Sequence, residues 1–304
     1  MKALCTLLFL PIFLLSEMLI TPIPSDIKLN NKKVLLGKML FHDTRLSKDD
    51  TISCASCHDI SNGGDDNRAF SIGVNNQVGT VNSPTILNSS LNFVQFWDGR
   101  VNTLEEQAVG PIHNSIEMNS NFVEIISKLK NDDVYKKQFS QIYNTTINKN
   151  NIIDAIVEFE KSLTTPNSKF DLYLKGQKDI LNEKEKKGYE LFQSYGCISC
   201  HNGVNLGGNL FQKVGIIDSY FKEDETNLGR YNITKQNKDK FYFKVPTLRN
   251  IELTAPYLHN GSLKDLRSVI EIMIKYQVGA IYEDKDVENI ELFLKTLTGE
   301  IPNV

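Results

Sequence analysis

Two short stretches, Cys54-Ala55-Ser56-Cys57-His58 and Cys197-Ile198-Ser199-Cys200-His201, decide how this sequence is interpreted. Both have the spacing C-x-x-C-H, which is the attachment signal of c-type haem. Two thiols about one turn apart reach the two vinyl groups of a haem and form thioethers, and the adjacent His lies under the ring and ligates the iron. The sequence therefore predicts two covalently bound c-type haems, with His58 and His201 as the proximal iron ligands.

Other interpretations of these cysteines fit less well. A four-cysteine zinc site usually has its pairs about 15–20 residues apart, whereas His58 and His201 are 143 residues apart. Redox-active disulfide pairs need a strand–helix context of the thioredoxin type, which no pattern here indicates. Chance is a poor explanation, because the one other cysteine, Cys5, lies in the leader described next.

The first 20 residues have the pattern of a secretory leader. Lys2 precedes an apolar run of 13 residues from Ala3 to Leu15, the length of a signal-peptide core and short for a bilayer-spanning helix. Pro11 argues against a buried helix here. The cleavage signal is poor, so an uncleaved anchor stays open as an alternative. We predict a signal peptide over residues 1–20 and a periplasmic protein.

Length and composition set the remaining limits. A chain of 304 residues is expected to form about two domains. With 40% hydrophobic residues it can bury a sizeable core, which excludes a long disordered tail and a polytopic membrane protein. Its 34 basic and 37 acidic residues give a net charge of −3, so we expect no nucleic-acid partner, because there is no basic excess to neutralise phosphates.

The periodic segments are helical. Apolar residues recur at helical spacing before the first haem motif, in two stripes of the first half and in two more near the end of the chain. The stripes are Leu35, Leu36, Met39 and Leu40; Phe122, Ile125, Ile126 and Leu129; Ile152, Ile156, Phe159 and Leu163; Leu263, Leu266, Ile270 and Met273; and Val287, Ile290, Leu294 and Leu297, with Gly299 as the stop. Helix starts are predicted at Asn121 with Glu124, at Asn182 with Glu185, and at Ser262 with Asp265.

Long loops and a linker complete the predicted organisation. The stretches 61–92 and 202–240 are rich in Gly and Asn, and loops of this length are uncommon unless they are functional. Pro166, with polar neighbours from Thr164 to Ser168, is the best linker. We predict a mainly α protein of two cytochrome c-like haem domains with long loops, residues 21–166 and 167–304, whose halves otherwise share little visible sequence.

Several strings of this sequence closely resemble bacterial di-haem cytochrome c peroxidases. They are residues 40–47 (LFHDTRLS), 53–58 (SCASCH), 96–100 (FWDGR), Glu117-Met118 and 253–259 (LTAPYLH). The resemblance runs from about Leu35 to Gly299. It implies reduction of hydrogen peroxide to water in the periplasm, in the N-terminal domain, with electrons delivered through the C-terminal domain from a small c-type cytochrome or a cupredoxin. It also admits a homodimer.

The resemblance assigns the catalytic residues of the first site. Glu117 matches the group that moves a proton between the two peroxide oxygens, work that suits a carboxyl group whose pKa burial raises. Gln107 and Phe96 match further residues that line this pocket. Each of the three has a plainer alternative, as a solvated acid, a surface amide or a packed ring.

At the second site, the resemblance assigns Met273 as the axial ligand opposite His201, which gives a high potential. Met273 also fits an apolar stripe and could be core filler. Trp97, the only Trp, matches a residue of the electron route between the haems. Asn82, Thr254 and Pro256 match a calcium site at the domain junction, and His259 is expected to be structural, near a haem propionate.

One position departs from the family pattern. Many members have a second His 16 residues after the first haem-binding His, which caps the first iron in the oxidised enzyme and is released on reduction of the second haem. Here that position is Val74, which cannot ligate iron. His42 is interpreted as structural and His113 as a residue near the pocket with no sign of being a ligand. The switch by reduction is therefore not expected in this chain.

Two rival functions stay open at this level. A di-haem oxidase of the methylamine-utilisation type, which acts on a partner protein, would replace the axial Met by Tyr, and Tyr276 is three residues from Met273. A non-catalytic di-haem electron carrier would have six ligands on both irons. Glu117 and the absence of a ligand at Val74 argue against the carrier.

Overall fold

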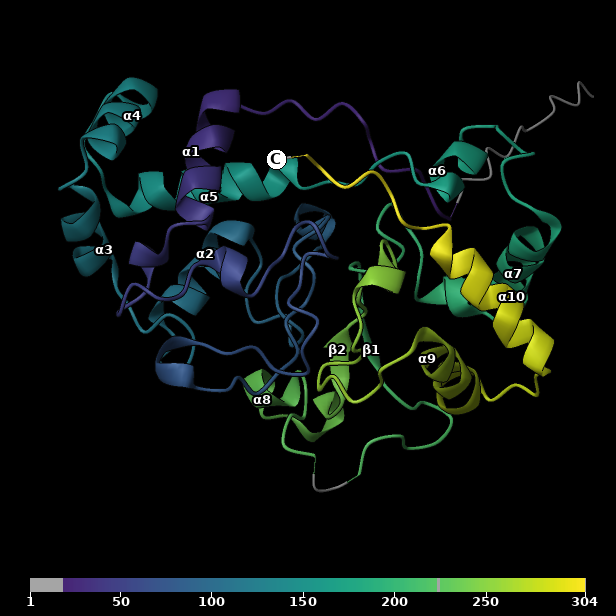
Figure 1. Cartoon of the computed structure of the whole chain (residues 1–304). Coiled ribbons are helices and arrows are strands. Elements are labelled where there is room, and N and C mark those ends of the chain that lie inside the picture. Colours follow the sequence, from purple (N-terminus) through teal and green to yellow (C-terminus); the bar gives the residue numbers. More distant parts are fainter. Residues whose placement is uncertain (1–18, 223–224, 304) are drawn as a thin grey trace, which may run out of the picture.

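The computed structural model of this chain describes residues 19–222 and 225–303, so most of the predicted signal peptide lies outside the described residues. The protein is mainly helical, as predicted, with a single two-stranded antiparallel sheet in the described part. Figure 1 shows one group of helices at each side and the sheet between them. None of the helices in the described residues is long and apolar enough to cross a membrane.

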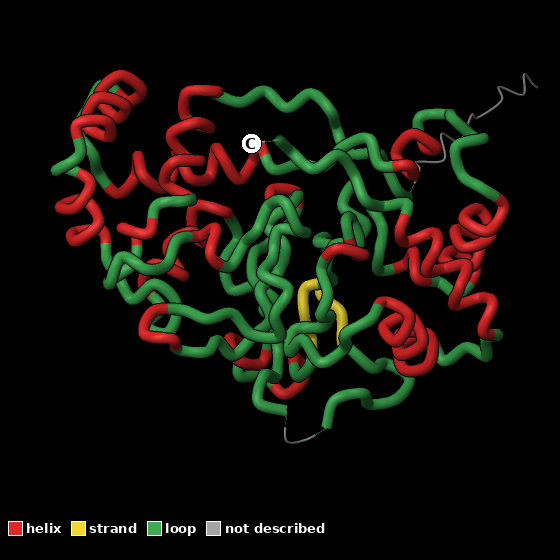
Figure 2. Tube along the Cα trace, in the orientation of Figure 1, coloured by secondary structure: helices red, strands yellow, loops and turns green. Residues whose placement is uncertain are grey.

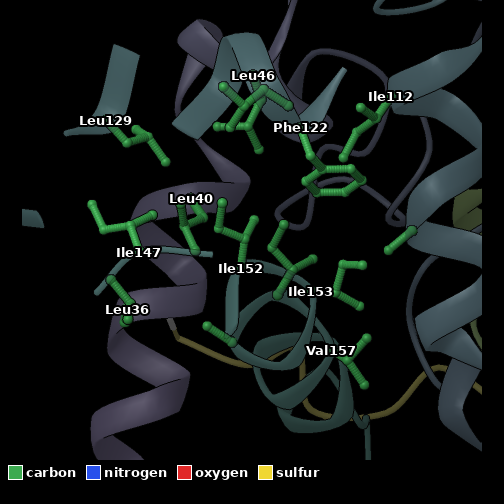
Figure 3. Close-up of a cluster of buried hydrophobic side chains, with 14 of the residues drawn as sticks. Leu36, Leu40, Leu46, Ile112, Phe122, Leu129, Ile147, Ile152, Ile153 and Val157 are labelled. Carbon is green, nitrogen blue, oxygen red and sulfur yellow. The ribbon is translucent and has the colours of Figure 1, made fainter. Parts of the chain in front are cut away.

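The first half forms a helical layer around one apolar cluster. Its helices are α1 (Asn31–Phe41), α2 (Leu104–His113), α3 (Phe122–Leu129), α4 (Asp133–Tyr143) and α5 (Lys149–Ser162). Helix α1 packs closely along α5 because Gly37 has no side chain: a Cβ there would lie 1.9 Å from the Ala155 carbonyl oxygen. Figure 3 shows Leu40 of α1, Ile152 of α5 and Phe122 of α3 in this cluster.

The second half repeats this arrangement with its own helices. These are α6 (Lys169–Leu174), α7 (Glu183–Ser194), the short α8 (Tyr231–Thr234), α9 (Leu266–Ile272), which continues as a π-helix over Met273–Val278, and α10 (Asp284–Lys295). Strands β1 (Phe211–Lys213) and β2 (Tyr242–Lys244) pair between the halves. Helix α7 packs on α10 as α1 does on α5, with Gly188 against the Asn289 carbonyl.

Side-chain caps explain where the helices begin. Asn121 accepts a hydrogen bond from the Glu124 amide, and Asn182 and Glu185 form a reciprocal capping box, both as predicted. The third predicted start needs correction: Asp265 itself is the N-cap of α9, and Ser262 lies before it. The last helix ends at Lys295, so Leu297 packs in the core just beyond it.

Loops fill the space between the two helical layers, as Figure 2 shows. Both C-x-x-C-H motifs lie on short 3₁₀ turns, Cys54–Ser56 and Cys197–Ser199. The predicted linker is not an exposed tether: Thr165 is fully buried and its amide donates to Asn88 Oδ1 over 2.9 Å.

The ends of the described chain cross between the halves. Ile20 packs in the core of the second half, and the Ile23 amide donates to Asp171 Oδ1 over 3.3 Å. Near the other end, Ile301 packs against the first-half cluster that contains Phe41 and Phe159. The first half is therefore tied to the second by both ends of the chain as well as by the central connection.

The structure reveals an internal repeat that the sequence hides. Pro84-Thr85 and Pro246-Thr247 each begin a turn that ends three residues later at an Asn in the left-handed conformation, with φ 60° at Asn88 and 61° at Asn250. The Asn88 amide donates to the Leu163 carbonyl at the end of α5, and the Asn250 amide donates to the Leu297 carbonyl just after α10. The two halves are therefore built on the same plan.

Candidate di-haem site

A cavity of about 540 Å³ lies beside the second C-x-x-C-H motif. Cys197, Cys200 and His201 line one part of its wall, and Leu266, Met273 and Ile274, from α9 and its continuation, line another. Most of the remaining wall is apolar, which suits a large flat cofactor.

Both motif histidines are held in the orientation that a proximal ligand needs. His58 Nδ1 lies 3.1 Å from the Gly64 carbonyl oxygen and His201 Nδ1 lies 3.2 Å from that of Leu206. A carbonyl accepts a hydrogen bond only from a protonated Nδ1, so Nε2 is the free, unprotonated atom. Burial lowers the pKa of His201 to about 4 and also lowers that of His58, so both rings are neutral.

The four motif cysteines are free thiols, not disulfides. Burial raises the pKa of Cys54 to about 12 and that of Cys197 to about 11. No cluster of three or more His, Cys, Asp or Glu among the described residues resembles a metal site, which removes support for the four-cysteine zinc alternative. Thiols, orientated imidazoles and an apolar cavity together fit covalent haem.

Met273 and Tyr276, the two alternatives for the axial ligand, lie differently. Met273 lines the cavity together with His201. Tyr276 does not line it; its ring packs edge-on against Tyr220, with the centroids 5.3 Å apart. The π-helix that starts at Met273 widens the last turn of α9, and such local widening is common at functional sites.

The first half has no such methionine. Helix α9 follows a hairpin in which Leu258 and Gly261 have positive φ, and α2 follows one in which Phe96 and Gly99 do. The N-caps that follow, Asp265 and Thr103, are therefore equivalent. Counting along both helices, the equivalent of Met273 is Pro111, and that of the cavity-lining Val269 is Gln107.

Glu117 lies just beyond α2, close to the first motif. Asn114 Nδ2 donates to Glu117 Oε1 over 2.5 Å. Burial raises the pKa of the Glu117 carboxyl group, while the Asn114 hydrogen bond and the Arg100 charge oppose that rise. Burial likewise raises the pKa of Cys57, and the charge of Glu117 adds to that effect, so the two groups are near neighbours.

Phe96 joins this group through Arg100. The Arg100 guanidinium lies 3.3 Å from the centroid of the Phe96 ring, and Arg100 pairs with Asp98 at 3.0 Å. The ring also lies against Gly110 of α2, where a Cβ would be 3.0 Å from it. Phe96 and Glu117 therefore flank the same side of α2.

The segment that contains Val74 is docked on the Glu117 segment. Val74 is fully buried, and its amide donates to the Glu117 carbonyl over 2.9 Å. Gln77 Nε2 donates to the Ser115 carbonyl over 3.2 Å. His113 is exposed and packs on Phe122, and His42 is exposed at the end of α1, so neither ring is buried in this region.

Trp97 connects the halves at the rim of the second cavity. It lines that cavity, and its Nε1 donates to the Asn82 carbonyl over 2.9 Å. Its own carbonyl accepts from the Lys244 amide of β2 over 2.8 Å. His259 lines the same cavity, and its Nε2 has no hydrogen-bond partner among the described residues, although Glu225 Oε1 is 3.7 Å away. A carboxylate-bearing cofactor edge fits such an atom.

The three residues predicted for calcium all line this cavity. Asn82 Nδ2 donates to the Arg68 carbonyl over 2.8 Å, so its Oδ1 is the oxygen left for a cation. Thr254 and Pro256 would offer backbone carbonyls.

Two buried charged residues of this cavity were missed. Lys244 is 7% exposed, and burial lowers its pKa to about 8; Asp65 is 1% exposed, and burial raises its pKa to about 7. Neither stands in a motif or a periodic stripe, so the sequence carried no signal for them.

Fold and site together define a protein with two c-type haem sites of unequal surroundings. Comparison with known proteins agrees. The family described as "Di-haem cytochrome c peroxidase" matches residues 31–179. A cytochrome c peroxidase of Escherichia coli strain K12 is 46% identical over 283 residues, 92% of this chain, which spans 61% of the length of that relative. The cytochrome c551 peroxidase of Nitrosomonas europaea is 45% identical, over 93% of this chain and 85% of its own.

The chain therefore belongs to the di-haem cytochrome c peroxidase family, and the family predicted from the sequence is confirmed. Among solved structures, a MauG-like protein associated with microbial copper homeostasis aligns with a TM-score of 0.82 at 28% identity, over 95% of both chains. The relatives named as peroxidases also support the predicted enzyme class, and a di-haem family implies two haems.

Proposed function

We propose that this chain reduces hydrogen peroxide to water at the first haem site, with electrons that enter through the second. The observation that carries the proposal is the difference between equivalent positions: Met273 lines the second cavity, whereas its counterpart in the first half is Pro111, which has no atom that can ligate iron. One site then has a thioether for a stable redox couple, and the other has room for a substrate.

Haem iron, when bound by His58, supplies the position where a peroxide oxygen binds. The protein supplies the proton transfer. Glu117 is buried enough to have a raised pKa, so it can take the proton of the near oxygen and return it to the far oxygen, which leaves as water. Asn114 holds the carboxyl group in one orientation. Gln107, on the adjacent turn of α2, is proposed as a second polar group of this pocket.

The overall step consumes one peroxide, two protons and two electrons and forms two waters. Trp97, at the junction of the halves, is the proposed route for the electrons, because it lines the second cavity and belongs to the first-half chain. The donor is proposed to be a small c-type cytochrome or a cupredoxin.

The remaining proposals concern organisation. We propose two cytochrome c-like domains, residues 21–166 for the reaction and 167–304 for electron transfer, with calcium held by Asn82, Thr254 and Pro256 at their junction. The first 20 residues are proposed as a signal for export to the periplasm. A homodimer is proposed from the family resemblance alone.

The rival functions have less support. A methylamine-utilisation oxidase would need Tyr276 as the axial ligand, but this ring packs on Tyr220 outside the cavity. A pure electron carrier would need a sixth ligand at the first site, where Pro111 and Val74 both lack one.

The test is turnover by the purified di-haem protein. A pre-reduced small cytochrome c should be oxidised only when hydrogen peroxide is added, with two donor molecules oxidised for each peroxide consumed. Haem stain on a denaturing gel and intact mass should report two covalent haems. A protein with both haems, an active donor and no peroxide-dependent oxidation would contradict the proposal.

A further inference from the structure

Helix α5 carries a buried acid where its counterpart α10 carries a leucine. The two helices correspond residue by residue. A Cβ at Gly37 would lie 2.7 Å from Phe159 Cβ and one at Gly188 would lie 2.8 Å from Phe293 Cβ, so the two Phe residues are equivalent. Counting on by one residue pairs Glu160 with Leu294.

Hydrogen bonds at the helix ends confirm this pairing. Ser162 Oγ donates to the Phe159 carbonyl and Thr296 Oγ1 donates to that of Phe293, each over 2.6 Å. One residue further on, Leu163 and Leu297 are both fully buried. The two helices therefore share one register through their last turns.

The pairing locates Glu160 in the first haem site. Leu294 lines the second cavity, together with the motif residues Cys197, Cys200 and His201. Glu160 should accordingly lie in the wall around the first motif. In agreement, its neighbour Phe159 belongs to the apolar cluster on which Cys54 packs, and the charge of Glu160 adds to the burial that raises the pKa of the Cys54 thiol.

Glu160 is an unusual member of that wall. It is only 5% exposed, and its Oε2 has no hydrogen-bond partner among the described residues. The charged groups that face it are Glu105 of α2 and Lys161 of its own helix, which pair with each other at 3.4 Å. A carboxylate without a partner is costly to bury, and a leucine here satisfies the second half, so packing alone does not explain an acid.

The electrostatic balance keeps the proton of Glu160 exchangeable. Burial raises its pKa to about 8; the charge of Glu105 adds to this rise, and that of Lys161 opposes it. A charge change on a nearby group in this low-dielectric wall therefore shifts the protonation of Glu160.

We propose that Glu160 is a redox-linked proton carrier of the first haem site. When the first haem gains one electron from the donor chain, the Glu160 carboxylate takes up one proton from solvent and becomes a neutral carboxylic acid. When the haem gives the electron up, the proton leaves. The inference depends on the proposed function only in placing a haem at the first motif, and its measurement is an equilibrium potential, which turnover does not affect.

The experiment is spectroelectrochemistry of the two-haem protein between pH 6 and 10. The midpoint potential of the first haem should fall as pH rises, because an added electron binds more weakly when no proton accompanies it. Glu160→Gln should abolish this fall while leaving the potential of the second haem unchanged. Glu105→Gln should keep the fall and move it to lower pH, since removal of a like charge eases ionisation of Glu160.

Each arm can overturn the proposal. A first-haem potential in the wild type that is flat with pH needs no variant to contradict it. A fall that survives in Glu160→Gln would assign the proton to another group. If Glu160→Gln does not fold, Glu160→Leu places the residue of the second half at this position, and infrared difference spectra of the wild type on reduction should report a carboxylic acid band that Glu105→Gln retains.

Discussion

Trp97 and His259 hold equivalent positions in the two halves and face each other across the junction, with ring centroids 6.5 Å apart and planes at 71°. Each follows a residue with positive φ, Phe96 or Leu258, and each precedes a hairpin glycine at the third position. The Asn82 segment joins them, because its carbonyl accepts from Trp97 Nε1 and its amide donates to the His259 carbonyl. The junction is thus built from the same hairpin used twice.

Replacement of the proposed axial methionine should alter the second haem only. In Met273→Ala the thioether that favours reduced iron is lost, so the second haem should become high-spin, with a lower midpoint potential, and turnover should fall. Optical and EPR spectra measure the spin state. Tyr276→Phe is the matched control and should leave both signals unchanged; loss of the low-spin signal in that variant instead would favour the oxidase alternative.

Replacement of Glu117 should separate haem binding from proton transfer. Glu117→Gln should retain two haems and lose turnover by about 10²–10⁴-fold, the usual contribution of a general acid–base group. Glu124→Gln, an exposed acid of the same half, should turn over at the wild-type rate. Steady-state rates with a reduced cytochrome measure this, and an unaltered rate in Glu117→Gln would remove the residue from the pocket.

The same carboxyl group predicts a pH dependence. Glu117 must start ionised to accept a proton from peroxide, and burial raises its pKa above the usual range for Glu. The wild-type rate should therefore fall as pH drops through this raised pKa, and the acid limb should vanish in Glu117→Gln, where only the small residual rate remains. The pH profile of kcat/KM tests the point, with the donor in excess.

A buried ion pair carries stability across the seam. Arg249 and Asp171 are both fully buried with 2.7 Å between Nη1 and Oδ1, and the same Oδ1 accepts from the Ile23 amide. Asp171→Ala leaves an unpaired buried guanidinium, so the free energy of unfolding should fall by about 3–5 kcal/mol. Lys184→Ala, which removes an exposed pair with Glu288, should cost less than about 1 kcal/mol. Urea unfolding compares the two.

The haem motifs, the helical stripes and two helix starts could be predicted because each is written in local spacing. The internal repeat could not, since it depends on positive φ at residues such as Phe96 and Leu258, whose types give no sign of it. The polar residues around Pro166 indicated an exposed linker, yet Thr165 is buried, because Asn88 and Asn250 satisfy its polar groups. Buried charges such as Lys244 and Glu160 leave no periodic trace either.

The last prediction concerns the resting state of the first site. Val74 stands where many relatives in the resemblance have a capping His, and its backbone is fixed by the hydrogen bond from its amide to the Glu117 carbonyl. Its segment is further closed by the Gly73 amide on the Gln77 carbonyl at 2.8 Å. We therefore expect no protein ligand to be displaced before peroxide binds.

The oxidised wild type should accordingly show a high-spin first haem and react with peroxide without prior reduction of the second. Val74→His supplies an imidazole at the docked position, so it should give a low-spin resting state that reacts only after pre-reduction. Val74→Leu is the control for bulk and should stay high-spin. Stopped-flow mixing of the oxidised proteins with peroxide compares all three; a wild type that is low-spin and inert when oxidised would mean that another residue caps the iron.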